Sequence, residues 1–302
     1  MAKKSVLIYL SIIGLLLVGA IGWYTYSFVS QPTAGPTTFD GQRAYADVKT
    51  QVAFGSRVPG TDGHIQVQEW IQKELESAGW QVEIQKSEAL GHPVENIVAK
   101  RNQQPVQILI GAHYDTRMFA DQDPNPAQHT QFVPGADDGA SGVAVLLGLA
   151  RSLPKDTVPV WLVFFDTEDN GNIPGWDWIL GSREFVRTNS IQPRAAIVLD
   201  MIGDADLNIY KERNSNPVLT DAIWATAKGL GYESKFIPQY KHSMLDDHTP
   251  FLQAGIPAVD IIDFDYPYWH TVQDTPDKVS AESLRVVGET ISTWVTQQSA
   301  QS

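Results

Sequence analysis

Acidic residues and histidines recur in five short segments of this chain, in an order and spacing that could build a metal site. The segments are, in chain order, His113–Asp115, Gly135–Gly139, Glu168–Asp169, Asp200 and Trp269–Thr271. Carboxylate and imidazole groups are suitable ligands for Zn²⁺, and a catalytic zinc ion usually has three protein ligands and one open position. The adjacent Glu168 and Asp169 would supply one ligand and one free carboxylate for proton transfer. These residues predict a zinc site that carries out chemistry.

Three of the segments follow apolar stretches that are typical of buried strands. The stretches and the residues after them are 106–112 with His113 and Asp115, 158–166 with Glu168 and Asp169, and 195–199 with Asp200. In open α/β sheets, ligands bind at the carboxyl ends of the strands. We therefore expect the three strand ends to place these side chains along one edge of a sheet.

The elements that must position these residues alternate between helix and strand. The residue pattern predicts helices over 43–52, 64–78, 140–153, 219–230 and 281–295, and strands over 80–85, 95–101, 106–112, 158–166, 195–201 and 258–263. Such alternation is typical of α/β proteins, in which helices cover both faces of a sheet. We predict a three-layer sandwich with a mainly parallel central sheet flanked by helices.

The composition limits the classes of function. The 302 residues carry a formal net charge of −13, so the basic footprint of a nucleic-acid-binding protein is absent. A hydrophobic content of 43% is sufficient for a sizeable buried core. The chain contains no cysteine, which excludes disulfide bonds and thiolate metal sites.

The first 28 residues differ in character from the rest of the chain. Lys3 and Lys4 precede an uncharged apolar run over 5–27, and about 20 apolar residues are enough to cross a bilayer as a helix. A lysine pair before the span predicts a single-pass membrane protein with its amino terminus inside and its catalytic part outside the cytoplasm. The alternative is a signal peptide cleaved near residues 18–20, which would give a secreted protein.

This pattern divides the chain into five parts. They are a cytoplasmic amino terminus (1–5), a transmembrane helix that anchors the protein (6–28), a linker (29–44), a catalytic domain (45–296) and a tail (297–302). We predict a linker because this segment contains two prolines and a glycine, which are typical of irregular segments.

Several of the segments resemble the M28 metallopeptidase family, which also contains the glutaminyl cyclases. The resemblance covers nearly all of 45–296, and its specific parts are 112–116, 134–142, 164–169, 181–183, 199–201, 246–248 and 269–271. It implies a zinc enzyme that acts on the amino terminus of a peptide or protein.

The resemblance also implies a role for each matching residue. The metal ligands would be Asp138, Asp169, His270 and, in a second metal site, His113 with Asp200. The catalytic residues would be Glu168, Asp200 and Asp246, with Glu168 as the general acid and base. The substrate would contact Trp269 and Asp247, and Asp115 would orient His113 from behind. Asp169 departs from the family pattern, because the usual ligand at this position is a glutamate, which is one methylene longer.

Three residues at these positions also have a structural interpretation. Asp138 precedes a helix and could cap it, since aspartate is a favoured N-cap residue. His113 could be a core histidine bonded to a carboxylate, and Trp269 could pack in the core. We expect the neighbouring Asp137 to be a solvated loop residue.

Individual residues favour one or the other branch of the family, the cyclases or the aminopeptidases. Trp269, directly before the last histidine, and Asp246, before the Asp-His pair, resemble the cyclases, which convert an N-terminal glutamine to pyroglutamate with release of ammonia. Asp169 and the complete His113 and Asp200 pair keep a two-metal aminopeptidase as the alternative. One zinc ion is expected for a cyclase and two for a peptidase. A non-catalytic binding module is the third interpretation, since a fold alone does not determine function.

Overall fold

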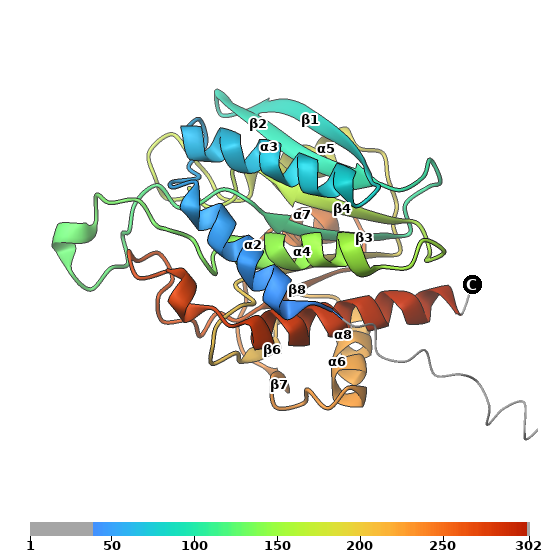
Figure 1. Cartoon of the computed structure of the whole chain (residues 1–302). Coiled ribbons are helices and arrows are strands. Elements are labelled where there is room, and N and C mark those ends of the chain that lie inside the picture. Colours follow the sequence, from blue (N-terminus) through green and yellow to red (C-terminus); the bar gives the residue numbers. More distant parts are fainter. Residues whose placement is uncertain (1–38, 301–302) are drawn as a thin grey trace, which may run out of the picture. The chain divides into compact units, whose positions relative to one another are not determined.

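A six-stranded mixed sheet lies at the centre of the computed structural model, which describes residues 39–300 (Figure 1). In spatial order the strands are β1 (Gln81–Ala89), β2 (His92–Lys100), β4 (Val160–Phe165), β3 (Ile108–His113), β5 (Ala195–Asp200) and β8 (Ala258–Ile262). The last four strands are parallel to one another, and β2 joins them antiparallel to β4. The predicted α/β fold is confirmed, with the β1–β2 hairpin as an antiparallel edge.

Helices cover both faces of this sheet and make three layers. One face packs against α3 (Asp62–Ser77), α4 (Ala140–Ser152) and α6 (Pro217–Gly229), and the other against α5 (Leu180–Thr188) and α7 (Thr249–Gln253). On the first face, α2 (Gly41–Ala53) and α8 (Ala281–Ser299) pack against α4. The core of the second face contains the rings of Phe165, Phe185 and Phe251, whose centroids lie 5.8 to 6.1 Å apart. The sequence pattern missed α5 and α7, and also a small sheet of β6 (Ile209–Lys211) and β7 (Phe236–Tyr240). Both helices are shorter than the window of about 11 residues over which a helical apolar period is recognised, and the strands of the small sheet are short as well.

The helix α4 approaches the sheet closely because its first turns contain small residues. A side chain on Gly142 would come within 2.3 Å of the Leu199 carbonyl oxygen and 2.8 Å of the Ala112 Cβ atom. Both β3 and β5 are buried along their whole length beneath the helices, as central parallel strands are. This close packing brings the segment before α4 next to the ends of β3 and β5.

The folded domain begins and ends outside the predicted limits of 45–296. Asp40 caps α2 by accepting a hydrogen bond from the Arg43 backbone N–H, so the helix begins at Gly41, inside the expected linker. Phe39 is 4% exposed, and its ring fills the space where side chains at Gly148 and Gly288 would stand. At the other end, α8 continues to Ser299, inside the expected tail.

The predicted anchor at 6–28 and the terminus at 1–5 lie outside the described residues. Within 39–300, no helix is both long enough and apolar enough to cross a bilayer. The anchor and the topology derived from it therefore stay predictions.

Phe39→Ala tests whether the domain begins before residue 45. Because the ring is buried between α4 and α8, its loss should lower the free energy of unfolding by about 3 kcal/mol, measured by urea denaturation. Phe132→Ala is the matched control, since Phe132 is 53% exposed and should change stability by less than about 0.5 kcal/mol. Equal stabilities of the two variants would contradict the burial of Phe39.

Candidate active site

Acidic and imidazole side chains from five parts of the chain meet at the carboxyl edge of the parallel strands. His113 ends β3 and Asp200 ends β5, whereas Glu168 and Asp169 follow β4. Asp138 lies just before α4, and His270 lies in the segment between β8 and α8. The expected convergence of strand ends is present in the structure.

Two clusters of metal-ligating atoms share Asp138. Asp138, Asp169 and His270 form one cluster, and His113, Asp138 and Asp200 form the other, with ligand atoms within 4.8 Å of one another in each. The His270 Nε2 atom lies 2.8 Å from Asp169 Oδ1 and 3.6 Å from Asp138 Oδ2. The His113 Nε2 atom lies 3.1 Å from Asp138 Oδ1 and 3.2 Å from Asp200 Oδ1. Asp138 can therefore face two cations, one through each oxygen.

The first cluster fits a zinc ion. Asp138 Oδ2 and Asp169 Oδ2 are buried and have no hydrogen-bond partner among the described residues. A buried carboxylate oxygen without a partner is costly, and a cation would satisfy both oxygens. One imidazole and two carboxylates also match a catalytic zinc site with an open position. The shorter side chain of Asp169 still reaches the cluster.

Hydrogen bonds to the backbone and a glycine position the metal-ligating and acidic side chains of the site. Asp115 accepts hydrogen bonds from the backbone N–H groups of Glu168 (3.0 Å) and Asp169 (3.2 Å), and its Oδ1 atom lies 3.5 Å from His113 Nδ1. Asp115 therefore faces His113, as expected, and also fixes the backbone of Glu168 and Asp169. Gly139 leaves room for the histidine, because a Cβ atom there would lie 2.5 Å from His113 Nε2.

Three residues at the site have left-handed backbone conformations although none is glycine. They are Thr167, Met201 and His270, with φ of 57°, 43° and 55°. Such conformations cost roughly 1 to 3 kcal/mol each and concentrate at functional sites. Here each one turns the chain directly beside a metal-ligating or acidic side chain.

Burial and crowding shift the pKa values of the acids at the site. Burial, with a contribution from Asp169, Asp246 and Asp247, raises the pKa of Glu168 well above its usual value. Burial likewise raises the pKa of Asp200 to about 7 and that of Asp169 to about 6. A carboxyl group that can hold a proton near neutral pH is suited to proton transfer.

The two histidines also have raised pKa values, although burial acts to lower them. Burial opposes the charge on His270, but Asp169, Asp121 and Asp138 outweigh it and raise the pKa of the imidazole to about 9. His113 is raised well above its usual pKa in the same way by Asp115, Asp138 and Asp200. Without a metal, the site would therefore bind protons on its imidazoles. Metal binding requires neutral imidazoles and would displace these protons.

A cavity of about 190 Å³ opens above the clusters. Five carboxylates line its polar side, from Asp138, Glu168, Asp169, Asp200 and Asp246. The apolar side includes Trp178, Phe264 and Trp269. Trp269 stacks on His270 with 3.8 Å between ring centroids and meets the Phe264 ring edge-on at 5.2 Å. Trp269 therefore lines the cavity, in addition to packing against its neighbours.

Two residues are not where the sequence analysis expected them. Asp247 is fully buried and does not line the cavity, so a direct contact with substrate is not supported by its position. Asp137 is also fully buried, and its carboxylate accepts a 2.7 Å hydrogen bond from the Gly203 N–H. Both lie next to a cavity-lining acid in the sequence, but the local backbone turns their side chains into the protein.

Asp246 belongs to a third buried group, with His248 and Asp260. The His248 Nε2 atom lies 3.5 Å from Glu212 Oε2. Burial acts to raise the pKa of Glu212, but bonds from His248 and backbone N–H groups lower it to about 2. Of the three members of this group, only Asp246 lines the cavity.

One acid that the sequence pattern did not indicate contacts a metal-ligating histidine. Asp121 Oδ1 lies 3.4 Å from His270 Nδ1, and Arg117 holds the Asp121 carboxylate at 2.5 Å. The same guanidinium donates to the Asp169 and Gly171 carbonyl oxygens and lies over the Trp178 ring. Asp121 precedes a segment with two prolines and follows no strand, so only the fold reveals its partner.

The chain is similar to proteins of one family. The model of peptidase family M28 matches residues 96–295. A glutaminyl cyclase structure from Porphyromonas gingivalis is 38% identical, with a TM-score of 0.81 over 87% of this chain and 99% of that one. A leucine aminopeptidase precursor from Bacteroides thetaiotaomicron is 32% identical, with a TM-score of 0.82 over 87% of this chain and 98% of the other. Glutaminyl-peptide cyclotransferase of Gloydius blomhoffii is 26% identical over 79% of this chain and 76% of its own length.

Asp121→Asn tests the contact behind His270. Carboxylates that orient a metal-ligating histidine typically change metal affinity by about 10- to 100-fold when they are replaced. We expect a zinc affinity weakened by this factor, measured by competition with a chromogenic chelator, and an unchanged unfolding midpoint. Asp156→Asn, at an exposed loop position, is the control and should bind zinc as the wild type does. Wild-type affinity in Asp121→Asn would show that this contact does not act on the metal.

Proposed function

The chain belongs to peptidase family M28, and on that premise we propose that it is a zinc-dependent glutaminyl-peptide cyclotransferase. Such an enzyme closes an N-terminal glutamine into pyroglutamate and releases ammonia. One observation carries the choice of branch: Asp246 and Trp269 line the same small cavity as Glu168. The similarity to the Porphyromonas gingivalis cyclase supports the same conclusion.

The cavity suits a single N-terminal residue. Its volume of about 190 Å³ leaves room for one side chain and not for an extended peptide. Trp269 and Phe264 provide flat apolar walls against which the methylenes of glutamine can pack. The carboxylates opposite them attract the α-amine, so the peptide would enter with its amino terminus first.

Asp138, Asp169 and His270 would hold the zinc ion. When bound, zinc would polarise the γ-amide carbonyl and stabilise negative charge on its oxygen. His113 and Asp200 lie beside this site on the other oxygen of Asp138.

Glu168 is the residue proposed to move the proton. The α-amine nitrogen forms a bond to the γ-carbon, and the bond from that carbon to the amide nitrogen breaks. Glu168 accepts a proton from the amine and delivers it to the departing nitrogen, which leaves as ammonia. Its raised pKa makes the Glu168 carboxylate a stronger base than an exposed glutamate, which favours acceptance of the proton from the amine. Asp200 and Asp246 line the cavity beside it, where they can hold the α-amine.

An aminopeptidase is the second candidate function. The cluster of His113, Asp138 and Asp200 could hold a second metal ion, and the leucine aminopeptidase precursor is similar along most of its length. In that reaction Glu168 would accept a proton from water, which would attack the first peptide bond. A non-catalytic role is disfavoured, because each expected metal position holds a residue that can ligate.

The reaction products distinguish the two enzymes. We expect the purified protein to convert a Gln-initiated peptide to a product lighter by one ammonia, with every residue retained, as measured by mass spectrometry. A chelator should abolish this activity and zinc should restore it. Release of leucine from a Leu-initiated peptide, without cyclisation of the Gln-initiated one, would establish the aminopeptidase.

Glu168→Gln is the matched variant for this experiment. It keeps the size of the side chain but removes the proton acceptor, so turnover should fall by about 10²- to 10⁴-fold. Zinc should remain bound, with one ion per chain. Wild-type turnover in this variant would assign the proton transfer to another residue.

We also propose that residues 6–28 anchor the protein in a membrane with the catalytic domain outside the cytoplasm. Lys3 and Lys4, followed by the uncharged run, support this topology. The same signals leave a secreted protein as the alternative.

Protease treatment of intact cells or spheroplasts tests the topology. External protease should remove the catalytic domain from the membrane fraction, while a cytoplasmic marker stays intact. Protection of the domain until the cells are lysed would contradict the proposal. Recovery of the untreated protein in the medium would instead indicate cleavage of the amino-terminal segment.

A further inference from the structure

The side chains that line the acidic cavity differ in character between its interior and its mouth. All five acids are buried, and Asp200 is the most exposed of them at only 8%. The five lining residues that are not buried are all aliphatic or aromatic: Trp178, Met244, Leu245, Phe264 and Trp269. A peptide whose amino terminus lies among the acids would therefore leave the cavity between apolar side chains.

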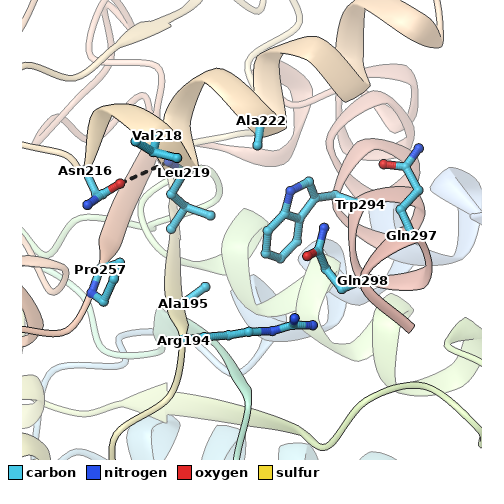
Figure 2. Close-up of a pocket in the computed structure, with 10 residues that line it drawn as sticks. All are labelled: Arg194, Ala195, Asn216, Val218, Leu219, Ala222, Pro257, Trp294, Gln297 and Gln298. Carbon is cyan, nitrogen blue, oxygen red and sulfur yellow. Dashed lines mark hydrogen bonds between the residues drawn. The ribbon is translucent and has the colours of Figure 1, made fainter. Parts of the chain in front are cut away.

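Leu245 is the most exposed residue of this mouth. It is 50% exposed and is one of seven large hydrophobic side chains that are exposed among the described residues. A leucine exposed by itself is common on protein surfaces. Another of the seven, Val218, lines a separate cavity of about 500 Å³ between α6 and α8, which no described acid lines (Figure 2). Within residues 39–300, only Leu245 of these seven lines the cavity that contains Glu168.

Hydrogen bonds fix the backbone on both sides of Leu245. The buried carboxylate of Glu212 accepts a 2.8 Å hydrogen bond from the Met244 N–H. On the other side, the Asp246 carbonyl oxygen accepts a 2.8 Å hydrogen bond from the Thr249 N–H. The half-exposed leucine is thus carried by a fixed turn, so a ligand that contacts it orders little additional chain.

One apolar surface extends from the interior of the cavity to its mouth. The buried Met201 and Ile262 form its inner part, and Met244, Phe264 and Trp269 pack against them farther out. Consecutive Cα atoms of a peptide are about 3.8 Å apart, so the residue that follows one held in the cavity stays beside the mouth. Because the cavity has room for one side chain, the outer part of this surface is left for the second residue.

We infer that the protein selects peptides whose second residue is large and apolar, and that Leu245 is a specificity-determining residue for this selection. The inference rests on the proposed function, because it places an N-terminal glutamine in the cavity. An apolar second side chain would cover Leu245 and remove apolar surface of both from water. An acidic one would gain no such contact, and the five carboxylates of the cavity would repel it.

Peptide binding and peptide turnover test this inference separately. Calorimetric titration of the zinc-loaded Glu168→Gln variant would give the dissociation constants of Gln-Leu, Gln-Gly and Gln-Glu amides. The wild type would give kcat/KM for the cyclisation of the same peptides. We expect Gln-Leu amide to bind about tenfold more tightly than Gln-Gly amide and Gln-Glu amide to bind most weakly, with kcat/KM in the same order.

Leu245→Asn, introduced into both proteins, removes the apolar surface and nearly keeps the size of the side chain. Because the leucine is half-exposed, the unfolding midpoint should change little. The preference for Gln-Leu over Gln-Gly should fall from about tenfold to about twofold or less. Leu90→Asn is the matched control, since Leu90 is 64% exposed in the turn between β1 and β2 and does not line the cavity. Its φ of 54° suits asparagine, and this variant should keep the full preference.

The possible results separate this inference from the proposed function. Equal affinities for Gln-Leu and Gln-Gly amides, with cyclisation of both, would overturn the inference and leave the cyclase function standing. A preference that Leu245→Asn leaves unchanged would overturn the role of Leu245. Tighter binding of Gln-Leu amide without any cyclisation would refute the cyclase function and still support the selection of an apolar second residue.

Discussion

Buried negative charge is the constraint on which this structure depends. Five carboxylates line one small cavity at the carboxyl edge of the sheet, and removing such charges from water is costly unless they are paired or protonated. The site meets this cost in three ways. Two imidazoles lie between the acids, Glu168 and Asp200 have raised pKa values, and the atoms around Asp138 are arranged to accept a cation.

Further acids hold the backbone that carries this charge. Asp115 binds the N–H groups after β4, and Asp274 accepts bonds from the N–H groups of Asp137 (2.8 Å) and Asp138 (3.2 Å). The buried guanidinium of Arg57 donates to the Pro134 and Gly135 carbonyl oxygens in the same segment. Buried carboxylates thus have two roles: some face the cavity, and others fix the loops that orient them. Functional side chains held in this way lose little freedom when a substrate binds.

The two edges of the parallel strands differ in charge. The ends of β3 and β5 carry His113 and Asp200, and the acids of neighbouring segments gather there. Ala195 at the beginning of β5 and Pro257 just before β8 line a second cavity, between α6 and α8, together with Arg194. The cavity at the carboxyl edge is therefore acidic, whereas no acidic residue is among the described residues that line the cavity at the amino edge.

The sequence by itself determined the parts that depend on local pattern. The apolar runs that became β3, β4 and β5 predicted a parallel sheet, and the acids after them predicted where its functional edge lies. The motifs around Asp138, Glu168 and His270 indicated the family, because their order and spacing can be recognised in one sequence. Signals of this kind are readable because each rests on residues a few positions apart.

Only the tertiary structure decided which atoms meet. Asp121 lies behind His270 because two distant loops pack together, and no local spacing records that contact. Asp247 and Asp137 have the residue type of functional acids, yet the backbone turns both into the interior. Phe39 belongs to the domain because glycines far along the chain, Gly148 and Gly288, leave space for its ring. Side-chain direction and long-range packing follow from the assembled fold, which a one-dimensional pattern does not contain.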